Sequence, residues 1–106
     1  MIKIPSIEIK ALVIFNDNAA QFFRFPIKNK VRMSLWEKEA RYSTPSETYS
    51  EVPIAINKET IVNIMFLSNY LNRPVLRGDE FCLGTFPIVI GNVKVLEVID
   101  SPINKI

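Results

Sequence analysis

The sequence contains no histidine, the side chain that serves most often as a general base and as a metal ligand. Serine–histidine–aspartate and cysteine–histidine catalytic arrangements are therefore excluded. The single cysteine, Cys82, rules out an intrachain disulfide and any zinc site built from several thiolates or imidazoles. Because Cys82 lies between two apolar residues of a predicted strand, we interpret it as a small buried residue and not as a nucleophile.

Glycine and long apolar runs are also scarce. The three glycines match neither nucleotide-binding spacing, and no apolar run reaches the roughly 18 residues needed to cross a bilayer. Asp79 and Glu80 are adjacent, so on a strand they would point to opposite faces, and we interpret them as the start of a strand and not as a paired acid and base. We therefore predict a protein that is not an enzyme and holds no cofactor or metal. An enzyme that uses carboxylates alone is an alternative to this prediction. The first residues lack the apolar core of a signal peptide, and we expect a soluble, cytoplasmic protein that does not bind membranes.

The commonest pattern along the chain is an alternation of apolar residues with a period of two. It predicts strands over 7–15, 31–35, 52–56 and 62–66, a further apolar segment over 21–27, and two strands near the C-terminus. Asn16-Asp17-Asn18 and Asn57-Lys58-Glu59 are typical of turns. The stretch from Tyr42 to Tyr49, rich in serine, threonine and proline, is predicted to be a mobile loop. Residues 1–106 are thus predicted to form one all-β domain, a small closed antiparallel β-barrel of about six strands.

Gly78, Gly84 and Gly91 each separate two apolar runs near the C-terminus. Glycine reaches positive φ without a Cβ clash, so it marks positions where a strand turns or bends. The pattern predicts a short strand over 80–83, a tight connection, and a long closing strand that bends at Gly91.

This C-terminal half resembles the third domain of translation elongation factor Tu. The residues that carry the likeness are Leu76-Arg77-Gly78-Asp79-Glu80-Phe81 and the run from Ile88 to Leu96. The resemblance implies a six-stranded barrel standing free as a small bacterial protein. Residues 21–30 contain Phe-Arg-Phe-Pro where the family has Gly-Tyr-Arg-Pro, so binding of tRNA does not carry over with the fold.

The function predicted from these features is protein binding without catalysis, most concretely by an immunity protein that neutralises a toxin domain through stoichiometric association. Exposed aromatic and basic residues carry most of the energy at such interfaces. The candidate contact residues are Arg24, Lys28, Lys30, Arg32, Trp36, Tyr42 and Tyr49. Trp36 is the last residue of an alternating strand, so the other interpretation is that it covers the barrel. The alternative is an accessory protein that binds RNA or tRNA, because the basic residues are interleaved with Phe22, Phe23 and Phe25. The net charge of +2 is low for a dedicated nucleic-acid binder.

Overall fold

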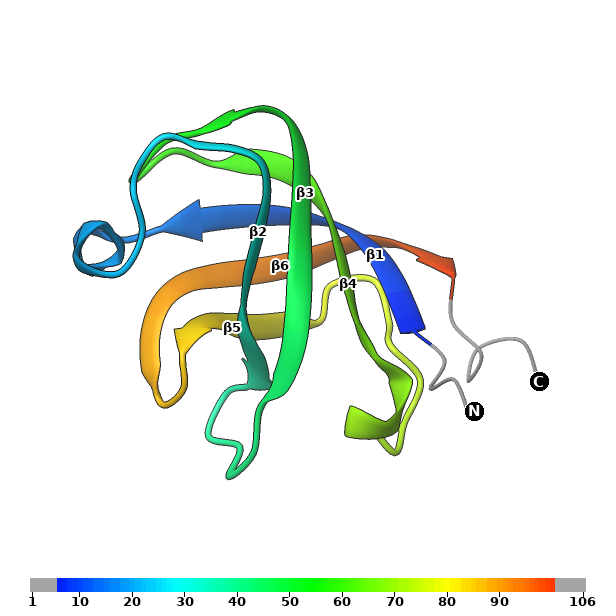
Figure 1. Ribbon diagram of the computed structural model, residues 1–106. Helices are drawn as coiled ribbons and strands as arrows, with labels where there is room; N and C mark the ends of the chain where they lie inside the picture. Colours follow the sequence, from blue (N-terminus) through cyan, green and yellow to red (C-terminus); the bar gives the residue numbers. More distant parts are fainter. Residues whose placement is uncertain (1–5, 101–106) are drawn as a thin grey trace, which may run out of the picture.

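Six antiparallel strands close into a barrel in the order β1-β4-β3-β2-β5-β6 (Figure 1). The computed structural model describes residues 6–100 of the chain. Its strands are β1 (Ser6–Phe15), β2 (Ile27–Glu37), β3 (Thr44–Ile54), β4 (Thr60–Leu67), β5 (Glu80–Thr85) and β6 (Ile88–Asp100), with short 3-10 helices η1 (Asp17–Gln21) and η2 (Ser68–Tyr70). The predicted all-β closed antiparallel barrel of about six strands is confirmed.

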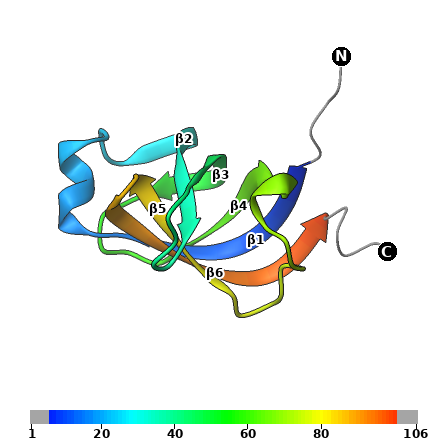
Figure 2. The ribbon, with the colours of Figure 1, turned by 90° about the horizontal axis from the view of Figure 1, so that it is seen from below.

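The barrel core follows from the alternation in β1. Its five inward residues are all 0% exposed: Ile7, Ile9, Ala11, Val13 and Phe15. Inward residues of β4 and β6 pack against them, so this side of the interior is filled by aliphatic and phenylalanine side chains. Burial of each Val, Ile or Phe side chain contributes about 1.5–3 kcal/mol relative to its exposure. The helix η1 lies at one end of the molecule, and the start of β1 and the end of β6 lie at the other (Figure 2).

Residues 21–27 do not form the predicted strand. Asn16 caps η1 by accepting a hydrogen bond on its side-chain oxygen from the Asn18 amide, at 3.0 Å, and the chain then passes through a turn before β2 begins at Ile27. Phe23 and Phe25 pack against the core from this connection. The apolar character of the segment therefore reflects a cover over the barrel end and not a strand.

The prediction of a mobile loop over 42–49 is also wrong. Residues from Thr44 onward belong to β3, which pairs with β2 and β4. The inward side chains of its first half are hydroxylated: Thr44, Ser46 and Thr48 are all buried. A strand with a polar inner face and a polar outer face shows no apolar alternation, and this is why the pattern was missed. The strand predicted over 52–56 is the end of β3, which stops at Ile54.

The closing strands differ from the prediction in the role of Gly91. Gly78 has a φ of +94°, as expected for a turn, whereas Gly91 does not adopt a left-handed conformation. Instead it lies opposite Phe15 in the β1–β6 pair, where a Cβ would come within 2.8 Å of the Phe15 ring. Gly91 is therefore required by close packing and not by a bend. The irregularity in this hairpin falls between Leu83 and Gly84.

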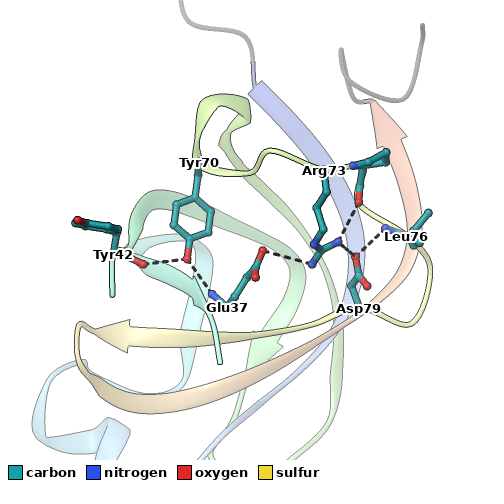
Figure 3. Close-up of polar contacts among 7 residues, drawn as sticks. Glu37, Tyr42, Tyr70, Arg73, Leu76 and Asp79 are labelled. Carbon is teal, nitrogen blue, oxygen red and sulfur yellow. Dashed lines mark hydrogen bonds and ion pairs between the residues drawn. The ribbon is translucent and has the colours of Figure 1, made fainter. Parts of the chain in front are cut away.

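A long connection, residues 68–79, is fixed to the end of β2 by polar contacts (Figure 3). The Tyr70 hydroxyl accepts a hydrogen bond from the Glu37 amide at 3.0 Å and donates one to the Tyr42 carbonyl at 2.9 Å. The Arg73 guanidinium contacts Asp79 at 2.8 Å and Glu37 at 3.4 Å. Leu71 and Val75 from this connection are buried in the core. Among residues 6–100 no helix has the length and apolar character needed to traverse a membrane.

Candidate functional site

Lys30 and Arg32 lie on the outer face of β2. The residues between and after them, Val31 and Met33, contact the core, so the alternation of the strand turns both cations outward. In the β2–β3 pair Lys30 lies opposite Tyr49 and Arg32 lies opposite Glu47. Two candidate cations and one candidate aromatic residue are therefore brought together by strand register.

Glu47 is the centre of this group. The Tyr49 hydroxyl donates a hydrogen bond to Glu47 Oε2 at 2.6 Å, and the carboxylate lies 3.7 Å from Lys30 Nζ and 3.6 Å from Arg32 Nε. The hydrogen bond from Tyr49 lowers the pKa of Glu47, with a further contribution from both cations. The same bond raises the pKa of Tyr49. Lys30 also lies over the Tyr49 ring, 5.9 Å from its centroid. The carboxylate thus holds two cations and a phenol in one arrangement on an exposed face.

A shallow hollow lies beside the carboxylate on the same face. Its apolar lining includes Pro45, Met65 and Leu67, and its edge includes Arg32 and Tyr49. The register of β3 with β4 brings the apolar lining next to the carboxylate, because Met65 of β4 lies opposite Glu47 of β3. We use the term candidate face for the outward residues of β2, β3 and β4 in this region: Lys30, Arg32, Pro45, Glu47, Tyr49, Met65 and Leu67.

Trp36 does not belong to the candidate face. Its side chain is 3% exposed, and its ring meets Phe86 edge-on, with centroids 5.1 Å apart and planes at 85°. It lies on the outer side of β2, opposite Cys82 of β5, where the β5–β6 connection covers it. The hypothesis that Trp36 is an exposed anchor is therefore wrong in this structure, since contact with a partner would first require displacement of Phe86.

Tyr42 is well exposed, at 76%, on the connection between β2 and β3. Figure 3 shows its carbonyl held by Tyr70. Tyr42 lies next to Ser43, which lines the edge of the hollow. It is therefore available at the border of the candidate face, on a connection that is tied down by a hydrogen bond.

Arg24 and Lys28 lie apart from the carboxylate, around a second hollow that Lys30 also lines. The rings in this hollow, Phe23 and Phe25, are only partly exposed, and Phe25 packs edge-on against Phe15 with centroids 5.4 Å apart. Phe22, the third ring of the predicted basic and aromatic cluster, is 41% exposed. The cluster is thus divided, with the cations and Phe22 at the surface and the other two rings packed against the core.

Sequence reasoning missed Glu47, Pro45 and Met65. A signal was present, because residues 44–49 alternate between small hydroxylated side chains and larger ones. That alternation would have placed Glu47 and Tyr49 on one face of a strand. It was overlooked because serine, threonine and proline together are typical of loops.

Cys82 is buried in β5, at 7% exposure, as predicted. Burial raises the pKa of its thiol, an effect that the nearby Lys38 charge partly offsets. A thiol with a raised pKa carries little thiolate at neutral pH and is a poor nucleophile. The position of Cys82 thus agrees with a packing role.

Comparison of the sequence with family models and with curated proteins gives no match. The likeness to the third domain of elongation factor Tu therefore stays a prediction that depends on the residues quoted above. The barrel and the candidate face, described from the structure alone, carry the functional argument.

Proposed function

We propose that this protein is a binding module that acts by stoichiometric association with another protein, without catalysis, and that the candidate face makes the contact. The observation that supports this proposal most strongly is the group around Glu47. Tyrosine and arginine are enriched among residues that dominate interface energies, and here Tyr49 and Arg32 are already oriented by one carboxylate. Pre-orientation reduces the entropy that is lost on binding.

The apolar part of the candidate face favours the same function. Met65 and Leu67 are half-buried beside the exposed Pro45, so the hollow can receive an apolar side chain. Methionine adapts its shape to different partners because it is unbranched and flexible. A central apolar contact surrounded by polar residues is the usual anatomy of a protein interface.

Charge favours a protein partner over RNA at this face. Strong RNA binding requires several cations that are free to neutralise phosphates, whereas both cations of this face are already paired with Glu47 and the net charge of the chain is only +2. A protein partner needs only a few carboxylates at the exposed sides of Lys30 and Arg32, and the rest of its contact can be apolar.

In its most concrete form the proposal is an immunity protein of the cytoplasm, which binds a toxin domain and blocks it. Such a role requires an interface surface and no catalytic group. The exposed cations of the candidate face would meet acidic residues on the toxin, and the hollow at Met65 would receive an apolar residue.

The test is titration calorimetry with the protein that co-purifies at one-to-one stoichiometry from the native host. We expect Tyr49→Ala and Arg32→Ala each to weaken the complex by at least about 1 kcal/mol, or roughly fivefold in Kd. The matched control is Lys94→Ala on β6, an exposed cation outside the candidate face, which should change Kd less than about twofold. Unchanged affinity in both test variants would place the interface elsewhere, and RNA in place of a protein partner would favour the alternative function.

A further inference from the structure

One edge of β2 is open over much of its length. On one side β2 pairs with β3 between Ile27 and Leu35, whereas on the other side it pairs with β5 only between Ser34 and Glu37. Within the part of the chain that the structure describes, residues 28–33 have no strand partner on the β5 side. Asn29 has a φ of 65° and the register with β3 shifts between Ile27 and Asn29, so the regular part of this open edge is residues 30–33. At about 3.3 Å per residue it is roughly 13 Å long, enough for a short added strand.

The backbone of this edge is oriented to form hydrogen bonds. The Met33 carbonyl faces β3, because it accepts a hydrogen bond from Ser46 Oγ at 2.8 Å. Successive carbonyls of a strand point to opposite sides, so the carbonyls of Arg32 and, two residues earlier, Lys30 face the open edge. Residues 28, 29, 30 and 32 are exposed, so an incoming chain can reach the edge.

Four cations surround the open edge. Lys28, Lys30 and Arg32 belong to it, and Arg24 lies across the hollow that adjoins it. Pairing with the same edge of a second copy would bring these cations together and is disfavoured. Glu47 contacts both Lys30 and Arg32, but one carboxylate beside four cations leaves the local charge positive. A segment with carboxylates at alternate positions would place them beside these cations, where opposite charges stabilise a cross-strand pair. Charge complementarity thus selects an acidic polypeptide as the occupant.

We propose that the open edge of β2 binds an extended acidic segment of a partner protein as an added strand of the barrel sheet. Main-chain hydrogen bonds to Lys30 and Arg32 supply affinity, and contacts between carboxylates and cations supply selectivity. This inference rests on the proposed function, because it names the chemistry of the partner segment that reaches the same two residues. The candidate face and the open edge are contiguous, since the side chains of Lys30 and Arg32 lie on the face and their carbonyls lie along the edge.

The probe is a seven-residue peptide of alternating glutamate and valine with acetyl and amide ends, added to the ¹⁵N-labelled full chain and followed by amide chemical shifts. We expect the largest shifts at residues 28–33, saturable binding, and at least fivefold weaker binding to the variant Lys30→Glu with Arg32→Glu. Lys94→Glu is the matched charge reversal on β6 and should leave binding within about twofold. A lysine and valine peptide should give no saturable shift.

The backbone component is tested by a fully N-methylated version of the acidic peptide, which keeps the carboxylates and loses its hydrogen-bond donors. We expect it not to bind. Equal binding of the acidic peptide and its N-methylated version would overturn strand addition. So would an acidic peptide that does not bind, or one that shifts protein amides mainly outside residues 28–33. Tighter binding of a poly-uridine oligonucleotide at the same residues at about 150 mM salt would also overturn it, in favour of nucleic acid. If the peptide fails while Tyr49→Ala still weakens the native complex, the proposed function stands without the added strand.

Discussion

Replacement of Gly91 by alanine tests how the closing strand packs on β1. The new Cβ would lie 2.8 Å from Cδ1 and 3.0 Å from Cε1 of Phe15, and 3.3 Å from the Ile14 carbonyl. Phe15 is 0% exposed, and its ring already meets Phe25 edge-on, so it has little room to move. Overpacking of this kind costs about 1–3 kcal/mol, and we expect Gly91→Ala to lower the free energy of unfolding by that amount.

A double-mutant cycle separates this steric cause from backbone strain. Phe15→Leu shortens the ring side chain that the new Cβ would contact, so we expect the double variant to lose about 1 kcal/mol less than the sum of the single variants. Gly78→Ala is the control, because its Cβ would meet nothing within 4 Å but its φ of +94° is unfavourable for alanine. It should cost about 1–2 kcal/mol, and Phe15→Leu should not relieve that cost.

The measurement is urea unfolding of all five variants, followed by the fluorescence of the buried Trp36 and by far-UV circular dichroism. Coincidence of the two probes would establish a two-state transition. If the costs of Gly91→Ala and Phe15→Leu add to within about 0.5 kcal/mol, the ring contact is not what excludes a side chain at position 91.

Two further predictions concern buried or half-buried polar groups and use the same unfolding measurement. Thr48 Oγ1 is buried without a hydrogen-bond partner among residues 6–100, so Thr48→Val should raise the free energy of unfolding by about 1 kcal/mol. Ser46→Ala should lower it by a similar amount, because the buried hydrogen bond from Ser46 to the Met33 carbonyl is lost. A loss of stability in Thr48→Val would show that the Thr48 hydroxyl is hydrogen-bonded. Tyr70→Phe should cost about 1–2 kcal/mol, since it leaves the Glu37 amide and the Tyr42 carbonyl without this partner. Burial raises the pKa of Tyr70 above its usual 10. The stability that the neutral Tyr70 hydroxyl contributes should therefore be complete below about pH 10 and fall as the pH rises further. The same dependence of unfolding free energy on pH in the wild type and in Tyr70→Phe would contradict this.

The sequence predicts the barrel wherever one face of a strand is apolar. β1 alternates over ten residues, and β4 alternates at Val62, Ile64 and Phe66, so both were located correctly. Residues 21–27 resemble a strand in composition, because an apolar segment with three phenylalanines can either form a strand or cover the end of a barrel. Only the three-dimensional path of the chain from β1 to β2 separates these two uses, and that path depends on contacts between segments far apart in sequence.

The candidate site was predicted less completely than the fold. Lys30, Arg32 and Tyr49 were identified from residue type, and the structure brings them together. The exposure of Trp36 could not be predicted, because the alternation of β2 correctly turns it outward and Phe86, fifty residues later, covers it. The role of Glu47 depends on the register between β2 and β3, which a pattern within one strand does not contain.

The composition of β3 separates the candidate face from the core. The first half of this strand buries only hydroxylated side chains, at positions 44, 46 and 48, and presents Pro45, Glu47 and Tyr49 outward. Apolar burial therefore comes mainly from β1 and its neighbours, and the outward residues of β3 do not contact the core. A change at Glu47 or Tyr49 alters the charge and shape of the candidate face while the barrel interior keeps its packing. Because the candidate face and the core draw on different residues of the same strands, substitutions on the face can report on binding without unfolding the protein.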